Sequence, residues 1–233
     1  MSPKRNPLIT NQLLAALPKK DYLSLQRHFE EIPLVFEDIL YQPNVFITDV
    51  YFPNSGILSL LAAANERATL EVGLVGKEGM IGLPVFLGVR TSRNRAVVQG
   101  VGSAMKMKAT TFRKECDNGA ALSQILQRYT HSLLTQITQS AVCNQFHSVE
   151  ARLARWLLMT HDRMGDDEFQ LTQDFLSNML GVRREGVSKA AAKLQQRKLI
   201  GYSRGHLRVL DRPGLEATSC ECYEIIRKES SSS

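Results

Sequence analysis

Residues 171–211 constrain the fold more than any other stretch, because they hold two short amphipathic patterns, a glycine between them and a basic strand-like segment. The first pattern begins at Thr172, whose hydroxyl is suited to accept a hydrogen bond from the first helical turn. It ends at Gly181, a residue type that tolerates the left-handed turn after a helix. A second apolar stripe then follows at helical spacing: Val187, Ala190, Ala191 and Leu194. The sequence therefore predicts two short helices joined by a tight turn.

The second predicted helix carries polar residues away from its apolar stripe. Arg184, Glu185, Ser188 and Lys189 lie on or near that opposite face. A helix of this size fits the major groove of DNA, where an arginine pairs with guanine and a glutamate accepts a hydrogen bond from the cytosine amino group. We therefore expect Arg184 and Glu185 to contact bases.

Charge separates this interpretation from a blander one. Residues 181–212 contain two acidic residues and nine basic ones, at positions 183, 184, 189, 193, 197, 198, 204, 208 and 212. The segment has a net charge of +7, whereas the whole chain has +6. Such a concentration suits the neutralisation of phosphates. The alternative is a solvated basic face on an ordinary helical hairpin, but the cap, the turn and the charge together favour a DNA-binding unit.

A two-stranded wing is predicted after the second helix. Its apolar residues alternate on both sides of a glycine-containing turn: Leu199, Ile200, Tyr202, Leu207 and Val209. Arg204 at the tip and Arg208 on the return strand are candidates for contact with the phosphate backbone, which positions a protein without reading sequence. The other predicted backbone contacts are Thr172, Arg183 and Ser188.

The segment resembles the DNA-binding signature of the Crp/Fnr family of bacterial transcription regulators. The resemblance rests on the runs 183–189, 199–200, 204–205 and 210–211, and it implies base contacts from Arg184, Glu185 and Lys189. Two positions depart from the family pattern: Gly186 replaces a threonine, and Lys189 replaces an arginine and cannot form a rigid bidentate fork. The DNA sequence of the operator is therefore not expected to match the family's usual operator in every position. Gly186 costs about 1 kcal/mol relative to alanine in a helix, so either DNA approaches closely there or the packing tolerates the loss.

The N-terminal half is predicted to be a short helical entry followed by strands. Leucines and a phenylalanine recur at helical spacing before Pro33, and residues 50–62 and 68–76 then alternate as strands do. The alternation continues from Val97 to Met107. This half resembles the antiparallel jelly-roll sensor domain of the same family, which is similar to cyclic-nucleotide-binding domains.

The run 76–99 occupies the place of the family's phosphate-binding cassette. Leu83 follows Ile81-Gly82 where cyclic-nucleotide binders carry a glutamate for the ribose, and their Arg-Ser pair falls here on Asn94-Arg95. Leu83 cannot hydrogen-bond a ribose, so cyclic AMP is a disfavoured ligand and no cofactor is expected with certainty. The predicted effector pocket comprises Gly82, Leu83, Arg93, Asn94 and Arg95. The alternative is a relic turn in a domain that answers to another small molecule or to none.

A long amphipathic helix is predicted between the halves. Its stripe is spaced by three or four residues: Leu122, Leu126, Tyr129, Leu133, Ile137 and Ala141. The resemblance implies that the first five form a homodimer interface, as a two-helix seam. The alternative is that the stripe packs on its own sensor domain. Residues 144–147 interrupt the stripe as a hinge, and Ser148 is predicted to cap the next helix.

Other chemistry is sparse. Cys220 and Cys222 could bind a metal with His206 or sense oxidation, but thiols one residue apart project to opposite sides of a strand and lack standard zinc spacing. We therefore expect reduced thiols and no metal site; Cys116 and Cys143 lie far apart in sequence, and an N-terminal cysteine cluster for iron and sulfur is lacking. The sequence has no nucleophile elbow and no Walker loop, so we do not expect an enzyme.

The sequence thus predicts an α+β protein: a sensor domain over 1–118, a dimerisation helix and hinge over 119–147, a winged helix-turn-helix over 148–215 and a tail over 216–233. We expect a cytoplasmic homodimer without membrane spans that binds palindromic double-stranded promoter DNA. The resemblance also implies RNA polymerase as a partner. Rival hypotheses are a ligand sensor that acts through protein contacts, and a redox or metal sensor.

Overall fold

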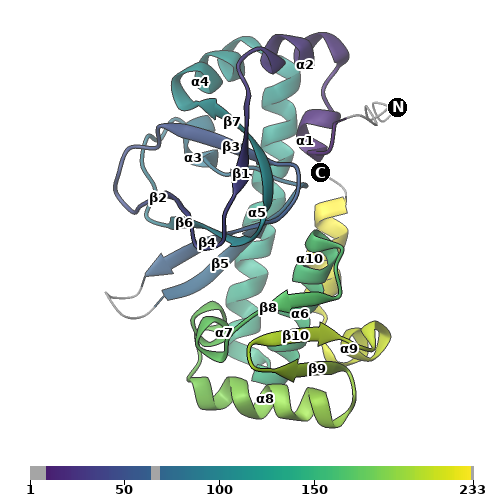
Figure 1. Ribbon diagram of the computed structural model, residues 1–233. Coiled ribbons are helices and arrows are strands. Elements are labelled where there is room, and N and C mark those ends of the chain that lie inside the picture. The colour runs from purple at the N-terminus through teal and green to yellow at the C-terminus, as the bar shows by residue number, and fades with distance from the viewer. Residues whose placement is uncertain (1–8, 64–68, 232–233) are drawn as a thin grey trace. The chain divides into compact units, whose positions relative to one another are not determined.

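The computed structural model describes residues 9–63 and 69–231 (Figure 1). Predictions for residues 1–8, 64–68 and 232–233 lie outside the described residues. They include the start of the sensor domain, the last two residues of the tail and the first residue of segment 68–76. The chain divides into two compact units: residues up to 60 with 73–134, and 61–72 with 135–232. No described helix is both long and apolar enough to cross a membrane.

The first unit, together with residues 61–72 of the second, contains two antiparallel sheets. Helices α1 (Gln12–Ala15) and α2 (Lys19–Gln26) precede them. The strands are β1 (Glu30–Leu34), β2 (Ile39–Tyr41), β3 (Asp49–Pro53), β4 (Ile57–Ala63), β5 (Thr69–Val75), β6 (Arg95–Gly100) and β7 (Gly102–Lys108). One sheet has the order β1-β7-β3 and the other β2-β6-β4-β5. With the helical second unit, this arrangement confirms the predicted α+β class.

Aromatic packing joins β3 to the residue before β1 and to helix α4 (Ala109–Asn118). The ring of Phe52 in β3 meets Phe29 edge-on at 5.6 Å between centroids, and Phe112 of α4 at 6.0 Å. Phe52 and Phe112 are at most 1% exposed. Edge-to-face pairs of this kind contribute about 1 kcal/mol beyond the area that they bury.

Two helices follow the sheets, and the break between them is shorter than the predicted hinge over 144–147, because residues 144–146 continue the first helix. Helix α5 (Ala120–Phe146) and helix α6 (Val149–Met164) flank residues 147 and 148. The Ser148 hydroxyl accepts a hydrogen bond from the amide of Ala151 at 3.2 Å, which confirms the predicted cap. Ser148 is therefore the N-cap at which α6 starts.

The second unit carries the helical pair and a small sheet. Its elements after α6 are β8 (Glu168–Gln170), α7 (Gln173–Leu180), α8 (Arg184–Gln196), β9 (Ile200–Ser203), β10 (His206–Val209), α9 (Arg212–Thr218) and α10 (Cys222–Ser231). The sheet order is β8-β10-β9, so the predicted two-stranded wing is completed by a third strand. The sequence does not predict strand β8, because alternation over only three residues cannot be distinguished from a loop. The predicted tail is largely helical.

Gly82 supplies the left-handed turn before α3 (Leu83–Phe86), and the structure predicts a cost for any side chain there. Its φ is 98°, and a Cβ added to it would lie 2.7 Å from Val50 Cγ1. We expect Gly82→Ala to lower the free energy of unfolding by roughly 2–4 kcal/mol, from backbone strain plus overpacking. Urea denaturation followed by circular dichroism measures this change.

The matched control is Gly165→Ala. Gly165 also has a positive φ, 69°, but a Cβ there would meet nothing within 4 Å. It should cost only the backbone strain, about 1 kcal/mol. Equal losses in the two variants would show that the contact with Val50 is unimportant.

Candidate nucleic-acid interface

Helix α7 begins and ends where its sequence signals lie. Thr172 Oγ1 accepts a hydrogen bond from the amide of Phe175 at 3.1 Å, and Gly181 adopts the left-handed conformation with a φ of 60°. The ring of Phe175 meets Trp156 of α6 edge-on, with 6.4 Å between centroids. Both predicted ends of the helix are therefore confirmed.

Helix α8 is held by its apolar stripe against α6. Its four predicted stripe residues are all at most 3% exposed: Val187, Ala190, Ala191 and Leu194. Arg152 of α6 donates a hydrogen bond to the carbonyl of Leu180, the last residue of α7. The turn between α7 and α8 is thereby fixed to the helix beneath it, and the polar face of α8 is left outside.

The predicted base-reading residues lie on that outer face. The side chains of Arg184, Glu185 and Lys189 are 65%, 74% and 73% exposed. Lys189 Nζ lies 2.6 Å from Glu185 Oε1, and Arg184 Nε lies 3.5 Å from Oδ1 of Asp174. Exposed pairs of this kind stabilise a fold by about 1 kcal/mol or less. A ligand that offers hydrogen bonds to these groups can therefore replace them at low cost.

The predicted backbone contacts surround this face. Arg183 and Thr172 are exposed at the N-caps of α8 and α7. Ser188 is half-buried and donates to Gln173 Oε1 at 2.6 Å, so its hydroxyl links the two helices. Their roles toward DNA stay predictions.

The wing ends in a tight two-residue turn at Arg204 and Gly205, whose φ values are 51° and 82°. Two positive φ values are the mark of a type I′ hairpin, which suits the twist of the strands. The amide of Leu171 donates to the Gly205 carbonyl at 2.7 Å, and the Tyr202 hydroxyl donates to the Leu171 carbonyl at 2.8 Å. Burial raises the pKa of Tyr202, so this hydroxyl keeps its proton. The exposed Arg204 is thus carried on a turn anchored beside the start of α7.

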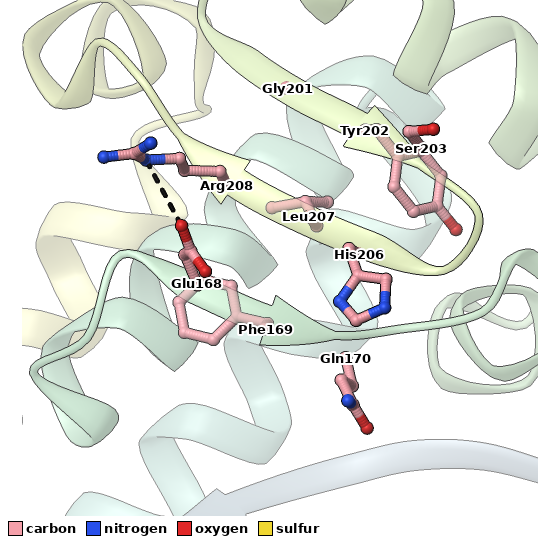
Figure 2. A pocket seen from close by; sticks show the side chains of 9 residues that line it. All are labelled: Glu168, Phe169, Gln170, Gly201, Tyr202, Ser203, His206, Leu207 and Arg208. Carbon is pink, nitrogen blue, oxygen red and sulfur yellow. Dashed lines mark ion pairs between the residues drawn. The ribbon is translucent and has the colours of Figure 1, made fainter.

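Figure 2 shows the residues that line a pocket on the three-stranded wing sheet. It is lined by Glu168, Phe169, Gln170, Gly201, Tyr202, Ser203, His206, Leu207 and Arg208. Arg208 Nε lies 3.6 Å from Glu168 Oε1 (Figure 2), and both side chains are more than 60% exposed. Arg208 is therefore a weaker candidate for a phosphate than Arg204, because a neighbouring carboxylate offsets its charge.

In the sensor domain, most of the predicted effector residues are already engaged. Leu83 is 7% exposed, and Arg95 Nε donates to Gln42 Oε1 at 2.9 Å. The amide of Asn94 donates to Ser92 Oγ, whereas Arg93 is exposed. Effector binding at these residues stays a prediction.

The predicted dimer stripe of α5 is mostly buried within its own chain. Leu122, Leu126, Tyr129 and Leu133 are at most 7% exposed, and the Tyr129 hydroxyl donates to the Met80 carbonyl at 3.1 Å. Ile137 is half-buried and Ala141 exposed. These four residues therefore follow the alternative prediction, in which the stripe packs on its own sensor domain. The reason is that this narrow apolar stripe meets the apolar surface of its own domain. A different face of α5 is exposed.

Cys220 and Cys222 are not placed with His206. Their sulfurs lie instead with Cys143 and His147, and the chain from 220 to 222 turns into the first residue of α10 rather than forming a strand. The expectation that the two thiols point apart is therefore wrong, because alternation of side chains requires an extended chain.

Residues 151–218 match the family model of the Crp-like helix-turn-helix domain. This part of the chain is a Crp-like helix-turn-helix domain. FixK2 from Bradyrhizobium japonicum has a similar structure, with a TM-score of 0.70 and 16% identity over 82% of this chain and 98% of its own. A CRP-family transcriptional regulator from Thermus thermophilus gives a TM-score of 0.67 and 15% identity over 81% and 96%. No curated protein sequence matches significantly.

The c-di-GMP-responsive global regulator CLP from Xanthomonas campestris is also similar, with a TM-score of 0.68 and 14% identity over 82% of this chain and 99% of its own. At such identities the likeness shows a shared fold. The chain thus carries the helix-turn-helix domain and the fold of the Crp/Fnr regulators, and the predicted resemblance is confirmed.

Gly186 of the Crp-like domain provides a test of the exposed face of α8. A Cβ at this position would meet nothing within 4 Å, so alanine fits without displacement. We expect Gly186→Ala to raise the free energy of unfolding by about 1 kcal/mol, because alanine favours a helix over glycine. The single tryptophan, Trp156, is buried in the same unit and reports unfolding through its fluorescence.

The same variant separates the two explanations of this glycine. If DNA approaches the backbone of α8 closely, Gly186→Ala weakens DNA binding despite the gain in stability. If the packing merely tolerates glycine, DNA binding is retained. A loss of stability would contradict the open space around position 186.

Proposed function

We propose that the chain is a sequence-specific regulator of transcription that binds palindromic promoter DNA as a homodimer and is modulated through its sensor domain. The observation that carries the proposal is the exposed set Arg184, Glu185 and Lys189 on a helix whose opposite face is buried. The Crp-like helix-turn-helix domain supports it, because this motif places its second helix in the major groove.

Each exposed group has a chemical role in this proposal. The Arg184 guanidinium forms two hydrogen bonds with guanine, and Glu185 accepts from the cytosine amino group. Lys189 provides a single ammonium near the same bases, held beside Glu185 at 2.6 Å. Arg204, at the tip of the wing, neutralises a phosphate and sets the position of α8 in the groove.

The dimer is proposed to form through the outer face of α5. The exposed residues of this face include no aspartate, glutamate, lysine or arginine: His131, Leu134, Thr138, Ala141, Val142, Gln145 and Phe146. Residues 131–146 contain no aspartate, glutamate, lysine or arginine, whereas a solvated helix face is normally charged. Positions 134, 138, 141 and 145 follow the alternating four- and three-residue spacing of a two-stranded seam. A second copy of α5 therefore fits this face.

A dimer also explains a palindromic target. Two recognition helices about 34 Å apart address two half-sites on one side of the duplex. An unidentified small molecule is proposed to act on the sensor domain, and RNA polymerase is the proposed partner at promoters in the cytoplasm. Leu83 lies where a ribose-binding carboxylate would be needed, which disfavours a cyclic nucleotide.

Base reading and backbone contact are separable by mutation. We expect Arg184→Ala to lose discrimination between operator and mutated operator, by about 1–3 kcal/mol at the contacted base pair. Arg204→Ala should weaken binding to all sequences alike and reduce the salt slope of the affinity by about 1. Fluorescence anisotropy at several salt concentrations, with operators selected from random DNA, measures both effects.

Lys114→Ala is the matched control, because Lys114 is an exposed base in α4 of the other unit. It should leave the affinity and the salt slope unchanged. Unaltered sequence preference in Arg184→Ala would contradict the proposed function.

The proposed seam predicts the effect of a charge on α5. Phe146 is 75% exposed, so Phe146→Glu should leave the fold of the chain intact. In a dimer, however, it places a carboxylate beside the uncharged seam, where it loses contact with water, and we expect the dimer to dissociate at micromolar concentrations. Analytical ultracentrifugation checks this outcome.

Leu23→Glu serves as the control, because Leu23 is 53% exposed on α2. It should leave the oligomeric state unchanged. A Phe146→Glu protein that sediments as the wild type does would rule out this face as the interface.

A further inference from the structure

Four potential metal ligands converge at the end of α5 and the start of α10. The sulfurs of Cys143, Cys220 and Cys222 and a ring nitrogen of His147 lie within 4.8 Å of one another. The three cysteines are buried and His147 is half-buried. All four belong to the second unit of the chain. The cluster is therefore a shielded set of three thiols and one imidazole.

The two halves of the set are brought together by different local rules. Cys143 and His147 are four residues apart, and the amide of His147 donates to the Cys143 carbonyl at 3.1 Å, so they share one face of a helical turn. Cys220 precedes α10 and Cys222 is its first residue, and the amide of Tyr223 donates to the Cys220 carbonyl. The Tyr223 hydroxyl donates to Asp162 of α6, which fixes this turn against the unit.

Two distances between the ligand atoms are close to those around a single tetrahedral ion. Cys143 Sγ lies 3.4 Å from Cys220 Sγ, and Cys222 Sγ lies 3.4 Å from His147 Nδ1. With metal–sulfur bonds of about 2.3 Å and a metal–nitrogen bond of about 2.0–2.1 Å, a tetrahedron places two sulfurs about 3.8 Å apart and a sulfur and a nitrogen about 3.6 Å apart. Small movements of the side chains therefore accommodate zinc.

A supporting shell surrounds the four ligands. His147 Nε2, the ring nitrogen that does not face the sulfurs, lies 3.3 Å from Glu221 Oε1. Metal-bound histidines commonly donate this second N–H to a carboxylate, which fixes the tautomer and orients the ring. Gln139 Nε2 donates a hydrogen bond to Cys222 Sγ at 3.2 Å. Packing of the cysteines as small apolar residues would not explain the contact of Glu221 with His147 or that of Gln139 with Cys222.

Two buried arginines of α6 interact electrostatically with the same cysteines. Arg152 and Arg155 are each 6% exposed, and in the described part of the chain their Nε atoms have no hydrogen-bond partner. Arg152 interacts electrostatically with Cys143 and Cys220, and Arg155 with Cys143. A buried cation is costly unless an opposite charge offsets it. A divalent ion with three thiolates and a neutral imidazole carries a net charge of −1, which supplies that offset.

We propose that Cys143, His147, Cys220 and Cys222 bind one zinc ion, which ties the end of α5 to α10. Three thiols release their protons to solvent as the ion binds. Four protein ligands leave no open position, which is the pattern of a structural site. Three soft sulfurs and one imidazole favour zinc over magnesium or calcium. The proposal does not depend on DNA binding.

A disulfide is the competing use of these thiols. Cys143 and Cys220 could be joined by oxidation, since their sulfurs are 3.4 Å apart. A disulfide would use only two of the four converging groups. It would not explain why Cys222 and His147 lie beside them, or why His147 contacts Glu221. The two chemistries differ in metal content and in the number of free thiols.

The first experiment measures metal in the full-length protein, purified under reducing conditions without a metal-affinity tag. We expect about one zinc ion per chain by mass spectrometry of the elements, and the visible absorption of tetrahedral thiolate-bound cobalt after exchange with Co²⁺. Cys143→Ser and Cys222→Ser should lose both signals. Cys116→Ser is the control, because Cys116 is a buried cysteine of α4 outside the cluster, and it should retain both.

The wild-type protein decides the question even if a ligand variant fails to fold. Wild type that lacks stoichiometric zinc and also shows no cobalt–thiolate absorption overturns the proposal. So does a disulfide between Cys143 and Cys220, found by peptide mapping of protein kept under reducing conditions.

The second experiment tests the supporting carboxylate. Glu221→Gln keeps the four ligands and removes the charge beside His147, and we expect zinc affinity to fall about 10- to 100-fold. Competition with a colorimetric chelator measures the affinity. Glu224→Gln is the control, because Glu224 pairs with Arg227 on α10, and it should bind zinc as the wild type does. Equal affinities in the two variants would contradict the arrangement proposed for His147.

Discussion

The burial of one face of α8 against α6 determines what the rest of the second unit can do. Val187, Ala190, Ala191 and Leu194 leave water together, so the remaining face of the helix must point outward with its charges. The other contacts of the unit hold this orientation. Arg152 joins α6 to the end of α7, and Tyr202 joins the wing to the start of α7. A rigid helix that presents a few exposed polar groups is what reading base edges requires.

The same unit also contains the cluster of three cysteines and one histidine, which is held together differently from the helix-turn-helix. The helix-turn-helix depends on apolar packing, whereas the cysteine and histidine cluster gathers polarisable ligands beside two buried arginines. In the proposed site, zinc adds a cross-link between the end of α5 and α10, at the end of a unit whose sheet is small. Because α5 also carries the proposed seam, its last turns have two uses: an outer face for a second copy and an inner face for the ion.

Local signals accounted for much of the fold. The caps at Ser148 and Thr172, the left-handed Gly181 and the stripe of α8 each depend on neighbours within a few residues, and all are confirmed. Strand β8 was missed because it is short and gains its hydrogen bonds only by pairing with β10. The sequence pattern assigns to a dimer partner the face of α5 that packs on its own sensor domain. Periodicity shows that a stripe is buried, but it does not show which surface covers the stripe.

The sequence by itself determined the α+β class, the helix-turn-helix with its excess of positive charge, and the exposed candidates Arg184, Glu185 and Lys189. Tertiary structure alone decided which face of α5 is free and that Cys143 meets Cys220, 77 residues away. The physical reason is distance along the chain. Helical and strand periods relate residues a few positions apart, whereas the approach of α5 to the turn before α10 depends on how α6, α9 and α10 pack together.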